Sequence, residues 1–385
     1  MKKIKNILKK YQLLYFMYNF VISSLLKFIS LFIKIDDKLL LFNSFGGAKF
    51  DDSPRVIYEY MKSNDKYKDY KMIWSIDNIK LLPKDVAYVK NNTIKFFITS
   101  LKSKYWITNS SMERGLKFKR KNTIYINTWH GSAIKLMGND MNDLKTNYNV
   151  SKPNYFYAQS KYDVDTFSKA YDLNPSIIPI VGLPRNDELV NVKKEDIIDI
   201  KNKLHLPLNK KIILYAPTFR EYNRDSNGCV LAPPINLKLW EEKLGKDYIL
   251  LFRAHYEVNK VLGIKENDFI KNYSDYNNLN ELLKISDILI SDYSSIMIDY
   301  SILERPIFNY IYDFEEYKEK RGMYFDIREK LPNNCKENEI ELLDRIVNMN
   351  YKEECEKTKK FKNEFVQVCG NARKYIDEII LKGDK

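Results

Sequence analysis

Residues 288–310 read ILISDYSSIMIDYSILERPIFNY, and this stretch indicates the fold class. A short apolar run, Ile288–Ser291, leads through an Asp/Ser turn into an apolar helical segment, and a second apolar run follows at Ile307–Tyr310. Apolar runs this short, bounded by turn residues, are typical of strands buried on both faces of a parallel sheet. The stretch therefore predicts a strand, helix and strand unit of an α/β protein.

The same alternation continues on both sides of this stretch. In the first half, strands are expected at residues 39–43, 71–75, 86–89, 105–108, 123–127, 155–158 and 177–181. In the second half they are expected at 211–215, 248–252 and 269–271, before the two strands quoted above. Helices are expected between them, for example at 54–62 with Ser53 as N-cap and at 162–170.

A polar helical stretch at 193–204, followed by Pro207, divides the strands into two series. We therefore predict two doubly wound domains, residues 38–205 and 206–385. The residues from 337 onward are charged and helical in pattern, and we expect them to pack across the domains as a closing element. In doubly wound sheets, ligands bind at the carboxyl ends of the strands, so the loops that follow strands are the candidate site.

Length and composition exclude several classes of protein. The 385 residues suit two domains of about 150–200 residues each. A hydrophobic fraction of 44% and an aromatic fraction of 14% exclude a disordered or collagen-like chain. The four cysteines show no CxxC spacing and no nearby histidine, which favours reduced thiols over a disulfide framework or a zinc site. The net charge of +13 suggests an anionic partner, but no nucleic-acid-binding module is present.

About half of the positive excess lies in residues 1–34, which hold seven lysines and no acidic residue. The uncharged run 11–26 is 16 residues long, shorter than the roughly 20 that span a bilayer. No small-residue cleavage site follows it. We interpret residues 1–37 as a basic amphipathic segment that lies on an anionic membrane surface. The alternatives are a helix packed on the core of the protein and a transmembrane anchor.

Two loops of the first half carry candidate functional side chains. The loop 127–132 contains His130 on a glycine-flanked turn, and a histidine there can accept a proton at neutral pH. The segment 132–135 that follows is expected to begin a helix, whose free N–H groups would bind anions. The loop 182–187 presents Arg185, whose planar guanidinium suits a phosphate group. A histidine hydrogen-bonded inside the fold and a surface arginine are the alternatives.

Three loops of the second half complete the set. The loops 215–220 and 252–256 each place an arginine after a strand, Arg220 and Arg253, and the second adds His255. An arginine paired structurally with an aspartate is the alternative for either loop. The third loop, 290–300, combines Asp292, serine hydroxyls and free N–H groups at the start of a helix, which suits a phosphate or a ribose.

The five loops, together with SFGGAKFDDSPRVIYEYM at 44–61, carry a resemblance to a known family. The motifs NTWHGSAIKLMG, GLPRND, YAPTFR, FRAHY and SDYSSIMIDYSILERPIFNYIYD, in this order, resemble those of the CDP-glycerol glycerophosphotransferases of teichoic acid synthesis. The resemblance spans roughly residues 38–330. It implies a GT-B fold, in which two Rossmann-like domains face each other.

The resemblance also implies roles for single residues. His130 matches the general base that deprotonates the acceptor hydroxyl, and Arg253 and His255 match a grip on the donor diphosphate, with His255 as a second catalytic residue. Further substrate contacts are implied for Trp129, Gly131, Ser132, Arg185, Pro217, Thr218, Arg220, Asp292, Ser294, Ser295 and Asp299. This chain departs from the common family pattern at Ser132, Ala133 and Ala254.

The activity implied is transfer of glycerol phosphate from CDP-glycerol to a hydroxyl of an undecaprenyl-diphosphate-linked saccharide, with release of CMP. The enzyme would act as a peripheral protein at the cytoplasmic face of the cell membrane. The length is most like that of a priming enzyme; the alternatives are a short polymerase, a CDP-ribitol ribitolphosphotransferase and a GT-B nucleotide-sugar glycosyltransferase. No acidic cluster follows a strand, so we expect no metal and no cofactor. The sequence does not indicate an oligomeric state.

Overall fold

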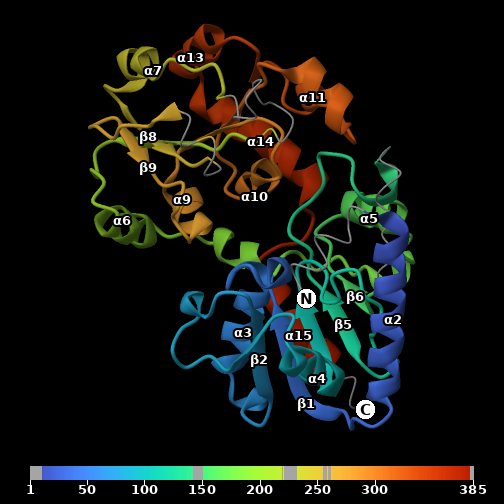
Figure 1. Cartoon of the computed structure of the whole chain (residues 1–385). Coiled ribbons are helices and arrows are strands. Elements are labelled where there is room, and N and C mark those ends of the chain that lie inside the picture. The colour runs from blue at the N-terminus through green and yellow to red at the C-terminus, as the bar shows by residue number, and fades with distance from the viewer. Residues whose placement is uncertain are drawn as a thin grey trace. The chain divides into compact units, whose positions relative to one another are not determined.

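The computed structural model describes residues 11–141, 151–218, 220, 232–254, 258 and 262–381. The chain divides into two compact units. The first unit comprises residues 1–130, 138–187 and 368–385, and the second comprises 131–137 and 188–367. Each unit is built on one six-stranded, wholly parallel sheet, as the alternating pattern predicts (Figure 1).

The sheet of the first unit has the order β3-β2-β1-β4-β5-β6. Its strands are β1 Asp36–Asn43, β2 Lys71–Ile76, β3 Tyr88–Lys90, β4 Ser103–Thr108, β5 Ile124–Asn127 and β6 Tyr155–Phe156. Its helices are α2 Gln12–Ser30, α3 Asp52–Lys62, α4 Ile94–Lys102, α5 Lys161–Tyr171 and α15 Tyr375–Leu381.

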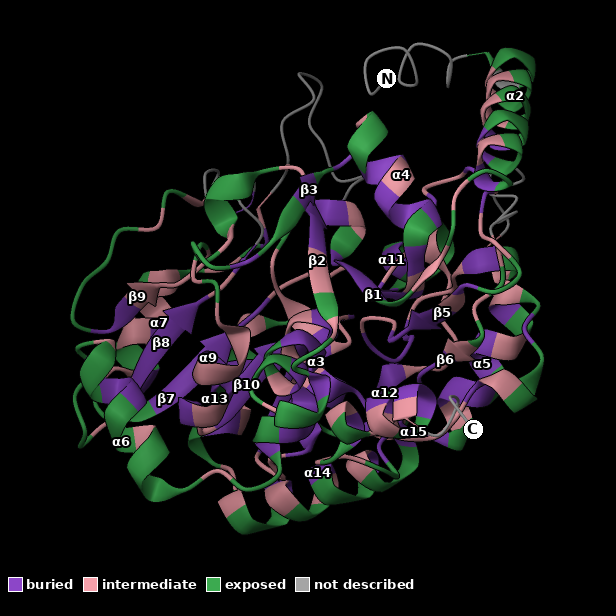
Figure 2. Ribbon diagram, turned by 90° about the horizontal axis from the view of Figure 1, so that it is seen from below, coloured by how far each residue is buried: buried purple, intermediate pink, exposed green. Residues whose placement is uncertain are grey.

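Alternate residues of β1 face opposite layers of helices. Leu40 and Phe42 belong to a core that includes Ile57 of α3 and Ile376 of α15, whereas Leu41 belongs to a core that includes Phe97 of α4. All three β1 side chains are fully buried, and Figure 2 shows the strands as the most buried part of the molecule. Burial on both faces explains why these strands read as continuous apolar runs.

The sheet of the second unit has the order β12-β11-β10-β7-β8-β9. Its strands are β7 Lys211–Tyr215, β8 Tyr248–Phe252, β9 Ile270–Asn272, β10 Ile288–Ser291, β11 Ile307–Tyr310 and β12 Cys335–Lys336. Its helices are α6 Lys194–Lys203, α7 Leu237–Leu244, α9 Leu279–Ile285, α10 Ile296–Ser301, α11 Phe314–Arg321, α12 Ile327–Lys330, α13 Glu339–Val347 and α14 Tyr351–Phe365.

In each sheet the first strand of the unit lies between the second and the fourth, so both have the Rossmann strand order. The direction of winding reverses between β1 and β4 in the first unit and between β7 and β10 in the second. In such sheets a crevice opens outside the carboxyl ends of the two strands at this point, and ligands bind there. The loops after β1, β4, β7 and β10 therefore define where a site can form in each unit.

The unit boundaries differ from the predicted boundary between residues 205 and 206. The structure assigns 131–137 and 188–205 to the second unit and returns 368–385 to the first. The terminal helix α15 belongs to the first unit because Ile376, Ile379 and Ile380 lie in the core beneath β1. The expected closing element is therefore divided, with α13 and α14 in the second unit and α15 in the first.

Two local predictions were also wrong. Residues 177–181 form no strand; Ile180 makes a single parallel bridge to Ala158, and a 3-10 turn occupies Pro175–Ile177. Helix α3 begins at Asp52 instead of Pro54, and Ser53 is not its N-cap. The Ser53 hydroxyl instead accepts a hydrogen bond from the backbone N–H of Arg185.

Candidate active site

His130 follows β5, and its imidazole is held by the loop after β4. The ring Nδ1 lies 2.6 Å from the backbone oxygen of Asn109. A carbonyl oxygen only accepts, so Nδ1 carries the proton, and Nε2 is left with its lone pair free to act as a base. Asn109 follows β4, directly beside the point where the first sheet reverses.

The surroundings of His130 favour its neutral form. Burial lowers the pKa of the imidazole below its ordinary value; the Asn109 carbonyl and the Asp52 carboxylate act in the opposite direction, and the Arg185 guanidinium adds to the lowering. A neutral imidazole at physiological pH is the form that accepts a proton from a hydroxyl. The geometry and the protonation state therefore fit the base predicted from the sequence.

Aromatic rings surround the same loop. The Trp129 ring lies 4.1 Å from the His130 ring, centroid to centroid, and 5.1 Å from that of Tyr171. Trp129 also adopts a left-handed backbone conformation, with φ of 51°. Its ring is thus part of an aromatic cluster that fixes the turn, and its predicted role as a substrate contact is not needed to explain its position.

Asp52 and Arg185 form a buried ion pair beside His130. Arg185 Nη1 lies 2.8 Å from Asp52 Oδ2 and donates to the backbone oxygen of His130 at 2.8 Å. Arg185 was predicted from its loop, but Asp52 was not, because nothing in the sequence connects the start of α3 with residues 130 and 185. Their proximity arises from the strand order, which places the loops after β1 and β5 at one edge of the sheet.

The expected helix at 132–135 is absent. Lys135 instead pairs with Met323 in an antiparallel bridge, and the N–H of Tyr324 donates to the oxygen of Ile134 at 2.9 Å. Gly131, with φ of 135°, directs the chain into this extended segment, where Ser132 is buried. Because the segment is extended, it does not present the free N–H groups of a helix N-terminus to an anion.

In the second unit, Asp292 organises the loops after β7 and β10. Both oxygens of its buried carboxylate accept from the N–H of Thr218, at 2.9 and 3.0 Å. Pro217 and Thr218 are thus fixed at the point where the second sheet reverses. Ser294 and Ser295 follow on the same turn and remain half-buried, whereas Asp299 of α10 is buried.

Arg220 is buried between two carboxylates. It bonds to both oxygens of Asp313 at 2.8 Å and also pairs with Asp292. Only 2% of its side chain is exposed. Burial lowers its pKa, but the two carboxylates outweigh this effect and raise it, so the guanidinium stays charged. The side chain is enclosed by the protein and holds the Asp292 turn in place, as in the alternative of a structural arginine–aspartate pair; its role as a substrate contact stays a prediction.

Arg253 directly follows β8 and is half-buried. Its Nη1 donates to the backbone oxygen of Tyr273 at 3.2 Å and to that of Tyr276. These contacts direct the guanidinium towards the loop after β9, which neighbours β8 on the side opposite β7. His255, the second predicted catalytic residue, lies outside the described residues.

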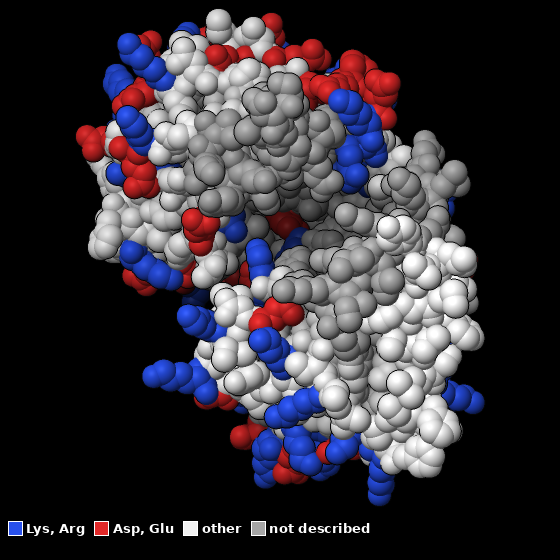
Figure 3. Space-filling model, in the orientation of Figure 1, with Lys and Arg blue, Asp and Glu red and all other residues white. Residues whose placement is uncertain are grey.

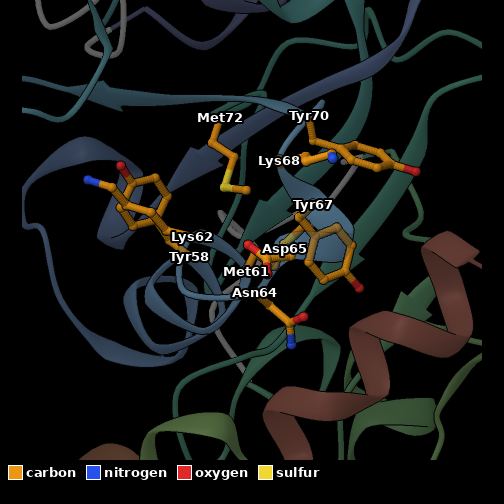
Figure 4. Close-up of a pocket in the computed structure, with 9 residues that line it drawn as sticks. All are labelled: Tyr58, Met61, Lys62, Asn64, Asp65, Tyr67, Lys68, Tyr70 and Met72. Carbon is orange, nitrogen blue, oxygen red and sulfur yellow. The ribbon is translucent and has the colours of Figure 1, made fainter.

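Two further features bear on ligand binding. A pocket of about 240 Å³ lies between α3 and the start of β2, and Figure 4 shows Tyr58, Tyr67 and Met72 among its lining side chains. It opens at the amino ends of the strands, and none of the predicted site residues lines it. Within the described part of the chain, no group of three or more histidine, cysteine or acidic side chains is arranged to hold a metal ion.

Comparison with known proteins agrees with the resemblance seen in the motifs. The family model described as CDP-Glycerol:Poly(glycerophosphate) glycerophosphotransferase matches residues 25–382. The chain belongs to this family. It is therefore a transferase of the glycerophosphotransferase class, and the family predicted from the motifs is confirmed.

Relatives of this glycerophosphotransferase include polymerases of different lengths. The teichoic acid poly(glycerol phosphate) polymerase of Staphylococcus epidermidis is 35% identical over 91% of this chain, which spans only 51% of that protein. The polymerase of the same name from Bacillus spizizenii is 34% identical over 90% of this chain and 92% of its own length.

Solved structures extend the comparison to the fold. The wall teichoic acid polymerase TagF is 33% identical with a TM-score of 0.84, and the match covers 98% of both chains. A variant of TagF soaked with CDPG matches with the same TM-score and coverage. The fold predicted from the sequence, with two parallel-sheet α/β units, is therefore shared with TagF.

Proposed function

We propose that this chain transfers glycerol phosphate from CDP-glycerol to a hydroxyl of a lipid-diphosphate-linked acceptor, such as an undecaprenyl-diphosphate-linked saccharide, and releases CMP. The product would belong to wall teichoic acid or a related cell-surface polymer. Family membership and the CDPG-soaked relative support the donor. The observation that carries the reaction is the His130 imidazole, with Nδ1 anchored on Asn109 and Nε2 free.

In the proposed step, the acceptor hydroxyl gives its proton to Nε2 of His130 as its oxygen attacks the β-phosphorus of CDP-glycerol. A new oxygen–phosphorus bond forms while the bond from that phosphorus to the bridging oxygen breaks, and the electron pair leaves with CMP. Negative charge grows on the phosphoryl oxygens and the leaving group. Arg253 and His255 would stabilise this charge, since fixed cationic and hydrogen-bonding groups act most strongly where charge develops.

The remaining contacts with the donor are assigned by motif. Pro217 and Thr218 would contact the nucleotide, and the half-buried hydroxyls of Ser294 and Ser295 would contact its phosphates. Gly131, Ser132 and Asp299 would shape the donor pocket. We also propose that the two units face each other in the GT-B manner, which would bring the His130 loop to the donor.

The His130→Ala variant tests the base. We expect its rate of CMP release from CDP-glycerol, with a defined lipid-linked acceptor, to fall by about 10²–10⁴-fold, which is typical for loss of a general base. Unchanged binding of CDP-glycerol would show that the donor site survives. Turnover near that of the unmodified enzyme would exclude His130 as the base.

The acceptor decides between priming and polymerisation. The prediction of a priming enzyme rests on length, and the B. spizizenii polymerase, of which this chain covers 92%, shows that a polymerase can be equally short. We favour repeated addition to a growing poly(glycerol phosphate), because relatives named as poly(glycerol phosphate) polymerases match 91% and 90% of this chain at 35% and 34% identity. Mass analysis of the product from a defined acceptor with CDP-glycerol, CDP-ribitol and UDP-sugars tests this. A ladder with glycerol phosphate spacing supports polymerisation, and a single addition supports priming.

Helix α2 supports a peripheral membrane location. One face packs on the first unit, where Leu26 is buried, Ile22 and Ile29 pack against the same core, and the Ser23 hydroxyl accepts from the N–H of Lys117. The other face exposes large apolar side chains, and Figure 3 shows this flank as mostly uncharged. They include Leu13, Phe16, Phe20, Leu25 and Phe28, all at least 50% exposed.

By length and composition alone, Leu13–Ser30 could also cross a membrane. We propose instead that α2 lies along the cytoplasmic membrane surface, because its inner face is fastened to the folded unit. The Phe16→Asp/Phe20→Asp variant should bind anionic vesicles at least about tenfold more weakly, since each phenylalanine would lose its place in the apolar layer. Leu208→Asp, at a site 55% exposed in the second unit, is the matched control. Unchanged vesicle binding by the α2 variant would contradict the proposal.

A further inference from the structure

Arg185 lies where a phosphate-binding arginine would be expected, but its contacts are made within the protein. Its Nη1 is shared between Asp52 Oδ2 and the backbone oxygen of His130, each at 2.8 Å. Only 16% of its side chain and 6% of that of Asp52 are exposed. The Nη1 group of this guanidinium is therefore engaged by two protein oxygens before any substrate binds.

Asp52 is itself held in an unusual backbone conformation. Its φ is +65°, in the left-handed region that aspartate adopts far less often than glycine. Its Oδ1 accepts from the N–H of Ser53 at 2.6 Å, at the first turn of α3, which leaves Oδ2 for Arg185. Burial raises the pKa of Asp52, but Arg185, the Ser53 N–H and His130 together outweigh burial and lower it, so the carboxylate is charged.

The loop that carries Arg185 is anchored at two points. The backbone N–H of Arg185 donates to the Ser53 hydroxyl at 3.3 Å, beside Asp52. Two residues later, the Asp187 carboxylate accepts from the N–H groups of Ala372 and Arg373 at 2.8 and 2.9 Å. The guanidinium therefore approaches His130 from a rigid support within the same unit.

We propose that Asp52 and Arg185 are a positioning pair that holds the His130 loop for catalysis, and that Arg185 is not a ligand of the donor. Arg185 fixes the His130 carbonyl, Asn109 fixes the ring, and Asp52 fixes Arg185. The inference rests on the proposed role of His130 as the base, and it adds two residues that act through His130.

The pair also sets the electrostatic field at the imidazole. Asp52 raises the pKa of His130 and Arg185 lowers it. The other charged groups nearby belong to neighbouring segments: Arg114 packs against Gly46, and Lys49 lies 5.7 Å from the ring of Phe45, which contacts His130. Removing one member of the pair should therefore move the His130 pKa in one direction, and removing the other should move it in the opposite direction.

The test uses the full-length protein and the variants Asp52→Asn, Arg185→Gln, Arg185→Lys and the double variant Asp52→Asn/Arg185→Gln. The chain has only three histidines, so the His130 imidazole can be followed by NMR, with His130→Ala to assign its signal. We expect the pKa to fall in Asp52→Asn and to rise in Arg185→Gln. Arg185→Lys, which keeps the charge, should stay near the unmodified protein.

The kinetic readout separates positioning from donor binding. We expect kcat to fall by about 10–100-fold in Asp52→Asn and in Arg185→Gln, since small misplacements of a catalytic group have effects of this size. The KM for CDP-glycerol should change by less than about threefold, because a positioning pair removes no substrate contact. The double variant should be no slower than Arg185→Gln alone, and Arg185→Lys should recover part of kcat.

Glu59→Gln is the control, because Glu59 pairs with Arg55 on the same helix, 3.1 Å away, and its side chain is 54% exposed. It should leave kcat and the His130 pKa unchanged. A raised KM with normal kcat in Arg185→Gln would overturn the proposal and restore Arg185 as a donor ligand. The proposal would also be overturned if the His130 pKa did not shift in opposite directions in Asp52→Asn and Arg185→Gln. If His130→Ala is active, the proposed base is wrong, and the NMR titration still decides whether the pair acts on His130.

Discussion

At the scale of single residues, the role of each candidate side chain depends on contacts with residues that lie far away in the sequence. His130 was identifiable as a candidate because it is one of three histidines and sits on a glycine-flanked loop. Its proposed function as a base depends on Asn109, 21 residues earlier, whose carbonyl selects the tautomer. The same holds for Arg220, which loop position suggested as a ligand and which two distant aspartates enclose.

The pKa of His130 predicts the pH dependence of the reaction. Burial lowers this pKa, so the imidazole remains neutral to a lower pH than a free imidazole, whose pKa is about 6.5. As the pH falls, kcat/KM should decline only when His130 becomes protonated, with a midpoint below about 6.5. A profile of kcat/KM from acid to neutral pH checks this. A midpoint above the value of free imidazole would contradict it.

Arg220 should matter for stability more than for donor affinity. The Arg220→Met variant leaves Asp292 and Asp313 buried without their cation, and breaking a buried ion pair costs about 3–5 kcal/mol. Urea unfolding measures the loss. Arg328→Gln is the control, because Arg328 is 41% exposed and its pairing with Asp326 should contribute no more than about 1 kcal/mol. Equal losses of unfolding free energy in the two variants would show that the buried ion pairs stabilise the protein no more than the exposed one.

At the scale of helices and strands, the local hydrophobic pattern predicts where strands occur, but it does not predict which strands pair with each other. The strand β7 and the two strands of the opening stretch occur with the predicted bounds. The segment 177–181 has a strand-like composition, yet it makes only the bridge between Ala158 and Ile180. A strand forms only where a neighbouring strand offers free backbone groups in the right register, and the composition of a segment does not determine whether such a neighbour exists.

Helix α15 provides a test of how the chain is divided. Ile376 and Ile380 are fully buried in the core beneath β1, although they follow the second unit in the sequence. Ile380→Ala should lower the free energy of unfolding by about 2–5 kcal/mol, the range for truncating a buried isoleucine. Ile340→Ala on α13, where the side chain is 51% exposed, is the control. A loss as small as that of the control would place α15 outside the core.

At the scale of the whole molecule, a Rossmann sheet is built twice in one chain. The carboxyl ends of β1, β4 and β5 carry the candidate base, and those of β7, β8 and β10 carry the candidate donor contacts. This division explains why no single segment of the sequence contains the site. It also explains why the five motifs identify the family only when they are taken together in order.

The chemistry of the whole site is predicted to be independent of added metal ions. The sequence shows no acidic cluster after a strand, and the proposed stabilising groups are Arg253, His255 and serine hydroxyls. Incubation with EDTA, followed by assay in chelator-treated buffer, should therefore leave the rate of CMP release unchanged. A loss that Mg²⁺ or Mn²⁺ restores would contradict the prediction and require an additional electrophile.

The amino-acid sequence by itself determined the α/β class, most strands, the loops that hold the candidate site residues and the family, because these depend on hydrophobic periodicity and on local motifs. The tertiary structure decided the partners. It brought Asp52 to Arg185, Asp292 and Asp313 to Arg220, and α15 to the first unit. The physical reason is that parallel strands are joined by long crossovers, so neighbours at one sheet edge are distant along the chain.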